Sequence, residues 1–251
     1  MCAGVFLLIP EPLGRKLLPH FVSYATGALL GAALLALLPD AIESVGRDGA
    51  HGIGAALLVG LGIFFVIEKL VLWWHTHANE HGHMDADETG HSHRHEHSHG
   101  KPDASGILVI IGDCVHNALD GVLIAAAFLT SFPLGLMTAF AVAAHEIPHR
   151  VGDFAILVHS GMSRGRAFLM NVATGLTAVI GGIAAFFGLH RAMGVLPYAL
   201  ALAAAGFLYI AVAGLIPGLH RRADPRTSLA QVILMGLGVA TIAWAESLAH
   251  R

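Results

Sequence analysis

The sequence predicts an all-α fold, a polytopic bundle of transmembrane helices. Of its 251 residues, 55% are hydrophobic and 12% are charged, whereas soluble domains carry about 25% charged residues. Its 30 glycines fall largely within the apolar runs, as expected for membrane helices that pack closely together. Seven apolar segments reach the length of about 20 residues that a helix needs to cross a bilayer.

The predicted spans follow one another along the chain. An apolar stretch before them, residues 3–9, is too short to span a bilayer and lacks the features of a signal peptide. We expect it to be the second half of a truncated first helix, which would give eight helices in a single transmembrane domain over residues 1–251. The seven complete spans are Phe21–Leu38, Ile53–Trp74, Ile107–Phe128, Leu134–Val158, Ala167–Leu189, Val195–Leu219 and Leu229–Leu248.

The distribution of lysine and arginine predicts the orientation of the bundle, because cytoplasmic loops carry an excess of these residues. Nine lysines and arginines lie in loops on one side of the membrane, and three lie in loops or at the chain end on the other side. We therefore expect both chain ends outside and the connection 75–104 in the cytoplasm. The nine are Arg15, Lys16, Arg94, Lys101, Arg164, Arg166, Arg221, Arg222 and Arg226, and the three are Arg47, Arg191 and Arg251.

Residues 75–104 form a long polar connection with nine histidines between His75 and His99. Such a composition cannot bury a core, so we expect a disordered cytoplasmic loop. Alternating histidines collect zinc, copper or nickel loosely, which favours metal capture or sensing over a plain solvated linker. The alternating residues are His91, His93, His95, His97 and His99.

Ionisable residues concentrate in two consecutive spans. Each costs about 2.5–3.5 kcal/mol within a membrane and usually marks a site or pathway. Side chains four positions apart share a helix face, and a short turn at 129–133 makes the two spans antiparallel neighbours, so their polar faces can converge. The ionisable residues are Asp113, His116 and Asp120 in the first span, with the polar Asn117 beside them, and His145, Glu146, His149, Arg150 and Asp153 in the second.

The donors in these two spans are imidazole, carboxylate and amide groups. This set suits Zn²⁺, Fe²⁺ or Mn²⁺ better than Cu⁺, which prefers sulfur ligands. Pro148 lies inside the second span, where it removes a helical hydrogen bond and bends the helix. The carbonyl freed in this way lies beside His145 and can line a cavity. Cys2 and Cys114 lie far apart and form no metal or disulfide motif.

Other polar residues leave two interpretations open. Asp40, Glu43 and the Glu68–Lys69 pair lie near span ends and could be interfacial anchors or line an entrance or exit. Asn171 and Thr174, three positions apart on an apolar span, could complete the polar site or bond to a neighbouring helix. A net charge of −3 without a basic patch excludes nucleic acid as a partner.

The segments HNALDGVLIAAAF (116–128) and AHEIPHRVGDFAILVHSG (144–161) resemble the two signature helices of the ZIP (Zrt/Irt-like) metal transporter family, in its branch with an HExPH fifth helix. LLPDA (37–41), the histidine-rich loop and FLYIA…LIP (207–217) extend the resemblance. It implies eight helices, chain ends outside the cytoplasm, and import of zinc, sometimes iron, manganese or cadmium, with no prosthetic group.

The resemblance also implies a location and a site. We expect the plasma (inner) membrane of a bacterium, with divalent metal ions and the lipid bilayer as partners and a homodimer left open. The implied metal site lies midway along the fourth and fifth helices. From their positions in the helices we add Asp113, Asp153, Asn171 and Arg150 as accessory residues. Carried over by position, the implied ligands are His116, Asn117, Asp120, His145, Glu146 and His149.

Four positions depart from the family pattern. Arg150 stands where relatives commonly have glutamate, Gly214 and Gly218 stand where many carry aspartate and glutamate, and Ala36 replaces a frequent histidine. A site for one metal ion is therefore favoured over a two-metal centre. Since Arg150 follows Glu146 by one helical turn, we expect an ion pair between them, or with Asp153.

Two other functions compete with transport. HEIPH matches HExxH, in which two histidines bind zinc and the glutamate acts as a general base, so an intramembrane zinc metalloprotease is the alternative. Pro148 inside the motif argues against it, because it distorts the presentation of the two histidines. A non-transporting metal sensor is the second alternative. Metal uptake into liposomes distinguishes all three.

Overall fold

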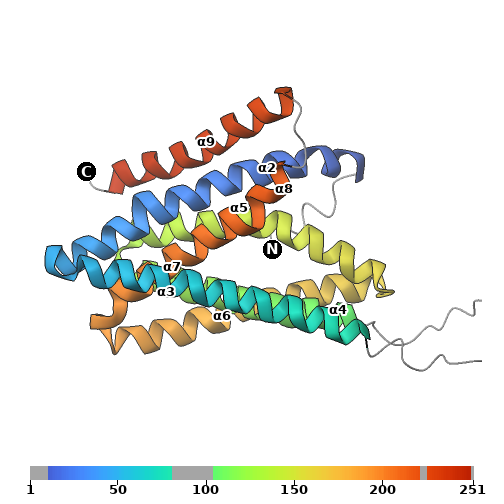
Figure 1. The fold of residues 1–251 in the computed structure, drawn as a ribbon, viewed down its shortest axis with the longest axis horizontal. Coiled ribbons are helices and arrows are strands. Elements are labelled where there is room, and N and C mark those ends of the chain that lie inside the picture. Colours follow the sequence, from blue (N-terminus) through green and yellow to red (C-terminus); the bar gives the residue numbers. More distant parts are fainter. Residues whose placement is uncertain (1–10, 81–103, 221–224, 250–251) are drawn as a thin grey trace, which may run out of the picture.

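The computed structural model describes residues 11–80, 104–220 and 225–249, and within them the side chains of residues 17–70, 110–220 and 226–248. Throughout these ranges the chain is a bundle of helices without a β-strand (Figure 1), which confirms the predicted all-α fold. Cys2 and the five alternating histidines of the loop lie outside the described residues.

The helices match the predicted spans to within a few residues, apart from the first two. Two short segments are π-helical, η1 within the first span and η3 within the sixth, and the apolar pattern did not predict them. In chain order the elements are α2 (Glu11–Gly31), η1 (Ala32–Leu37), α3 (Leu38–Glu80), α4 (Ala104–Thr130), α5 (Phe132–His159), α6 (Arg164–His190), the 3₁₀ turn η2 (Met193–Val195), α7 (Leu196–Tyr209), η3 (Ile210–Leu215), α8 (Ile216–His220) and α9 (Pro225–Ala249).

The first two predicted spans are joined by a sharp bend at Gly46 rather than by a loop. Its φ of 67° lies in the left-handed region that glycine adopts without a steric penalty. Helix α2 and the part of α3 that follows the bend run in opposite directions (Figure 1). The helix then continues to Glu80, so the first residues of the predicted disordered loop, 75–80, are helical.

Five helices of the described chain are long and apolar enough to cross a membrane. The first, Leu17–Leu70, contains the bend at Gly46, and it covers the first predicted span and all but the last four residues of the second. Helix α5 is not among the five, because the polar residues of its HEIPHR segment dilute its apolar character. The protein is therefore an integral membrane protein, while the total of eight helices stays a prediction.

Glycines bring several helix pairs into close contact. A Cβ atom at Gly121 of α4 would lie 1.9 Å from the carbonyl oxygen of Ala178 on α6, and one at Gly181 would lie 2.1 Å from that of Ala118. Residues without a side chain thus allow the α4 and α6 backbones to touch, as in other tightly packed membrane helices. Gly27 likewise allows α2 and α9 to pack closely, because a Cβ there would lie 2.0 Å from the backbone carbonyl oxygen of Met235.

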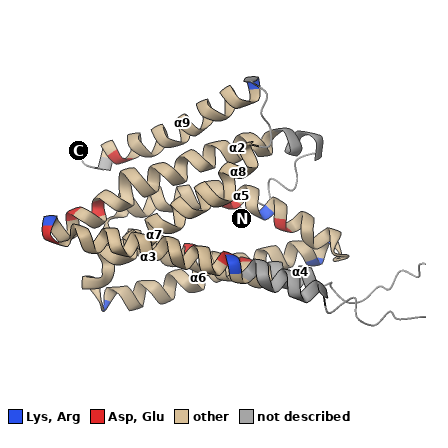
Figure 2. Ribbon diagram, viewed as in Figure 1, with Lys and Arg blue, Asp and Glu red and all other residues tan. Residues whose placement is uncertain are grey.

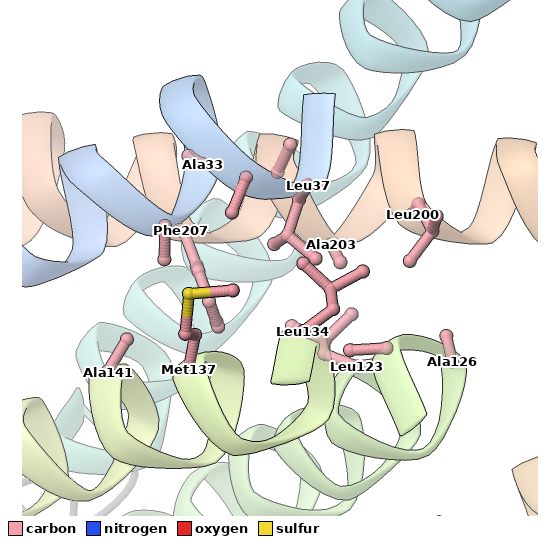
Figure 3. Close-up of a cluster of buried hydrophobic side chains, with 14 of the residues drawn as sticks. Ala33, Leu37, Leu123, Ala126, Leu134, Met137, Ala141, Leu200, Ala203 and Phe207 are labelled. Atoms are coloured by element: carbon pink, nitrogen blue, oxygen red, sulfur yellow. The ribbon is translucent and has the colours of Figure 1, made fainter. Parts of the chain in front are cut away.

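The buried apolar core lies where η1, α4, α5 and α7 meet (Figure 3). Leu37 of η1 and Phe207 of α7 are completely buried, and Leu134 of α5 is 1% exposed. These side chains, with Leu123 of α4, fix α4 and α5 against the rest of the bundle. The polar faces of α4 and α5 therefore lie on helices held in place by apolar packing.

The two ends of the bundle differ in their basic residues. The bend at Gly46 and the α6–α7 connection lie at one end, and the α5–α6 turn and the start of α9 lie at the other (Figure 1). The first end carries Arg47 and Arg191, and the second carries Arg164, Arg166 and Arg226. Between the ends most of the described ribbon is free of lysine, arginine, aspartate and glutamate (Figure 2).

Candidate metal site

The tight turn between α4 and α5 brings their polar faces together. Ser131 caps α5, because its hydroxyl oxygen accepts a hydrogen bond of 3.2 Å from the backbone N–H of Leu134. Proline at the following helix start suits this cap, since its missing N–H would have had no helical partner. The chain reverses within this single turn, so α4 and α5 run antiparallel, as predicted.

Four side chains converge at the α4–α5 interface, and we call them the first group: His116, Asp120, His145 and Glu146. One ligand atom from each lies within 4.8 Å of the others. The Nε2 atoms of the two histidines are 3.4 Å apart. Oδ2 of Asp120 lies 3.5 Å from Nε2 of His145 and 3.7 Å from that of His116, and Oε1 of Glu146 lies 3.8 Å from Nε2 of His116.

Two buried carboxylate oxygens of the first group have no hydrogen bond from any described residue. They are Oδ2 of Asp120 and Oε1 of Glu146. Asp120 and His145 are each 2% exposed, and buried carboxylate oxygens without a donor are costly. Both oxygens face the histidine Nε2 atoms, so a cation placed among these four atoms would satisfy them together.

Four of the six separations between ligand atoms of the first group are close to those of a tetrahedral metal site. Ligands about 2.0–2.1 Å from zinc stand about 3.3–3.4 Å apart at the corners of a tetrahedron. The four separations given above run from 3.4 to 3.8 Å. A contraction of a few tenths of an ångström would bring these four distances to the tetrahedral value, and the two remaining distances, from Glu146 to Asp120 and to His145, lie within 4.8 Å.

A second group lies one helical turn away along both helices, and it consists of Asp113, His149 and Asp153. Nδ1 of His149 lies 2.7 Å from Oδ2 of Asp153, an ion-pair distance without the alignment of a hydrogen bond. The same nitrogen lies 3.9 Å from Oδ1 of Asp113. The His149 side chain is 44% exposed, whereas the two aspartates are buried. The stacked rings of His149 and His116, with centroids 5.2 Å apart, join the two groups.

Arg150 connects the two groups. Its Nε donates a hydrogen bond of 2.7 Å to Oε2 of Glu146, and its Nη1 donates one of 3.0 Å to Oδ2 of Asp113. The ion pair with Glu146 agrees with the one-turn spacing, while the pairing with Asp113 on α4 was not predicted. Arg150 is 6% exposed, so its charge is neutralised inside the bundle rather than by solvent.

The guanidinium also holds residues of α4 and α6. Its Nη2 donates to Oδ1 of Asn117, and its Nη1 donates to Oγ1 of Thr174 and to the backbone oxygen of Asn171. The Asn171 amide returns a hydrogen bond of 3.0 Å to the backbone oxygen of Arg150. Asn171 and Thr174 therefore bond to a neighbouring helix, one of the two interpretations left open by the sequence.

The six predicted ligands thus fall into three settings. His116, Asp120, His145 and Glu146 form the first group, and His149 lies in the second. Both polar atoms of Asn117 are hydrogen-bonded, because its amide nitrogen donates to Oδ1 of Asp113 at 2.7 Å and its oxygen accepts from Arg150.

Two features of the structure were not predicted from the sequence. Tyr209 of α7 donates a hydrogen bond to the carboxylate of Glu68 on α3, so Glu68 bonds within the bundle. Gly175 of α6 leaves room for the guanidinium, since a Cβ there would lie 3.2 Å from Nη2 of Arg150. The sequence signal was the glycine directly after Thr174. Its role could be recognised only once Arg150 was known to reach α6.

Comparisons with known proteins place this chain in a single family. The family model described as ZIP zinc transporter matches residues 2–245. Zinc transporter ZIP13 of Danio rerio is 30% identical over 96% of this chain and 82% of its own length. Zinc transporter zipt-7.1 of Caenorhabditis briggsae is 31% identical over 96% of this chain and 74% of its own. Zinc transporter SLC39A7 of Rattus norvegicus is 33% identical over 94% of this chain and 67% of its own. Since the family model covers nearly the whole sequence, this chain is a member of the ZIP zinc transporter family.

Proposed function

We propose that the first group binds the divalent ion that this transporter carries, with zinc as the preferred ion. The observation that carries the proposal is the convergence of two imidazole nitrogens and two carboxylate oxygens within 4.8 Å, from two facing helices. The donors suit zinc, iron or manganese, with cadmium as a further candidate.

We propose that transport runs into the cytoplasm, from the end of the bundle that carries Arg47 and Arg191 to the end that carries Arg164, Arg166 and Arg226. The excess of basic residues at the second end supports this orientation. The second group lies towards that end, because α5 runs from its cap at Ser131 to the α5–α6 turn and Asp153 follows His145 along it. An ion leaving the first group would therefore meet His149 and Asp153 next.

The histidine-rich residues 75–104 belong to the same domain in this proposal. They would collect or sense the ion after its release, because alternating imidazoles bind zinc loosely. We propose a plasma membrane location for this import. The relatives named above are animal proteins, so an origin in a bacterial inner membrane stays a prediction.

The geometry argues against an HExxH protease. In such a site both histidines bind one zinc ion and the glutamate between them activates water. Here His145 belongs to the first group and His149 to the second, and Glu146 is hydrogen-bonded to Arg150. The relatives named above are zinc transporters, which also favours transport over catalysis.

Zinc uptake into proteoliposomes tests this function. The His145→Ala variant should lose uptake, because it removes a buried ligand; loss of an outer-shell residue alone costs about 10- to 100-fold in metal affinity. His159→Ala, at the exposed end of α5, is the matched control and should transport like the parent. If the His145→Ala variant takes up zinc at the parental rate, the first group is not the transport site. A parent protein that binds zinc but takes up none would instead be a sensor.

A further inference from the structure

The two groups differ in how far their carboxylates are already satisfied. In the first group, Oδ2 of Asp120 and Oε1 of Glu146 receive no hydrogen bond from the described residues. In the second, both carboxylate oxygens of Asp113 are used: Oδ1 accepts from Asn117 and Oδ2 accepts from Arg150. Each carboxylate of the first group therefore offers an oxygen to a cation. The second group still offers Oδ2 of Asp153, which also receives no hydrogen bond from the described residues, but it has lost its α4 carboxylate to neighbouring side chains.

The side chain that donates to Oδ2 of Asp113 is itself a cation. A guanidinium keeps its charge at any physiological pH and presents five donors in a rigid plane. That of Arg150 is buried between α4, α5 and α6 and takes one carboxylate oxygen from each group, Oε2 of Glu146 and Oδ2 of Asp113. It therefore lies where an ion bridging the two groups would otherwise find its ligands.

The charges of the two groups are consistent with this role. Four buried or half-buried carboxylates, those of Asp113, Asp120, Glu146 and Asp153, face one another across α4 and α5. Without a fixed positive charge this cluster would attract two divalent ions, because unpaired buried carboxylates are costly. Arg150 neutralises one of the four permanently and holds a second oxygen by a hydrogen bond. With one divalent ion in the first group, the net charge of the four carboxylates falls from −4 to −1, whereas it would be −2 without Arg150.

We propose that Arg150 is a built-in cation that replaces a second metal ion, so that this transporter binds one divalent ion per chain between α4 and α5. The proposal rests on the proposed function of the first group, and it adds the number of ions and the residue that sets it. Arg150 acts through Glu146 and Asp113, so it is a residue that determines stoichiometry without touching the transported ion.

The test is the number of zinc ions bound by the full chain, purified in detergent and equilibrated with Zn²⁺ alone. Any zinc on the histidine-rich loop contributes equally to every variant, so differences between variants report on the membrane site. Arg150→Glu should bind one zinc ion more than the parent. Arg150→Lys, which keeps the charge, should bind the parental number.

Arg166→Glu is the matched control. It makes the same change of charge at an exposed position of α6, outside the network, and should leave the count unchanged. An Arg150→Glu protein that is folded and binds the parental number would overturn the proposal and reduce Arg150 to a cross-link between helices. If that variant does not fold, Arg150→Gln decides by the same count, because it removes the charge and keeps a hydrogen-bonding side chain.

Including His145→Ala in the same titration separates this inference from the proposed function. That variant should bind one zinc ion fewer than the parent. If it does while Arg150→Glu gains none, the first group holds the ion and the role of Arg150 is wrong. If His145→Ala binds the parental number, the first group itself is not the binding site, whatever Arg150→Glu does.

Discussion

Nε2 of His116 on α4 and Nε2 of His145 on α5 lie 3.4 Å apart, close to the edge of a tetrahedral zinc site, about 3.3–3.4 Å. The two residues are 29 positions apart in sequence, and each belongs to a different helix. Any change that alters the ligand chemistry at one of them should therefore alter the choice of ion.

The first prediction uses this relationship to change ion preference. His145→Cys places a thiolate among harder ligands, and soft ligands favour cadmium and zinc over manganese. We expect cadmium to compete with zinc uptake at least about tenfold more effectively in this variant, and manganese to compete less. His159→Cys, exposed at the end of α5, is the control. Unchanged competition in both variants would mean that His145 does not contact the ion.

The second prediction concerns the stability that zinc contributes through Asp120. Zinc at about a hundred times its Kd stabilises a folded protein by about 2.7 kcal/mol. Asp120→Asn keeps the shape of the side chain and removes the charge that the ion requires. We expect the rise in Tm on adding zinc to disappear in this variant, measured by thermal unfolding in detergent.

Asp48→Asn, at an exposed position of α3, makes the same chemical change away from the site and should keep the rise. A parental rise in Asp120→Asn would show that Oδ2 of Asp120, buried without a hydrogen bond from the described residues, is not a ligand.

The third prediction tests the close contact of α4 and α6, which brings Asn171 and Thr174 to Arg150. A Cβ at Gly181 would meet the carbonyl oxygen of Ala118 at 2.1 Å, and overpacking of this kind costs about 1–3 kcal/mol. Gly181→Ala should therefore lower Tm. Gly188→Ala on the same helix meets nothing within 4 Å and should leave Tm unchanged or raise it, since alanine favours helix. Equal effects of the two would show that the helices are not in backbone contact.

The fourth prediction concerns the histidine-rich loop. Replacing residues 81–103 with a Gly/Ser segment of equal length should leave the maximal rate of zinc uptake within about twofold, because a flexible connection outside the pathway adds little free energy. Zinc bound per chain should fall, measured by equilibrium dialysis. A complete loss of uptake would instead place the loop on the transport route.

Much of the candidate site could be predicted from the sequence, because it depends on local helical geometry. His116 and Asp120 stack one turn apart on α4, as do His149 and Asp153 on α5. The short connection at Ser131 made the two helices antiparallel neighbours. These relationships follow from 3.6 residues per turn and need no knowledge of the other helices.

The division into two groups could not be predicted, because it depends on how α4 and α5 are rotated and shifted against each other. That placement comes from the apolar core around Leu37 and Phe207 and from the contact of Gly121 with α6. Likewise, the reach of Arg150 to Asp113 and Thr174 crosses three helices. The bend at Gly46 was also missed, since a glycine within a polar stretch is equally compatible with a loop.

The last prediction concerns orientation, on which the direction of transport depends. Ser163, just before α6, and Ala192, just after it, are both exposed and lie at opposite ends of that helix. With Cys2 and Cys114 replaced by alanine, Ala192→Cys should react with a membrane-impermeant maleimide in intact cells. Ser163→Cys should react only in inside-out vesicles, because its end of the bundle carries the excess of arginine. Ser163 makes no side-chain cap to α6, so this substitution should not disturb the helix. The reverse labelling pattern would place the histidine-rich loop outside, and the same bundle would then export the ion that we propose it imports.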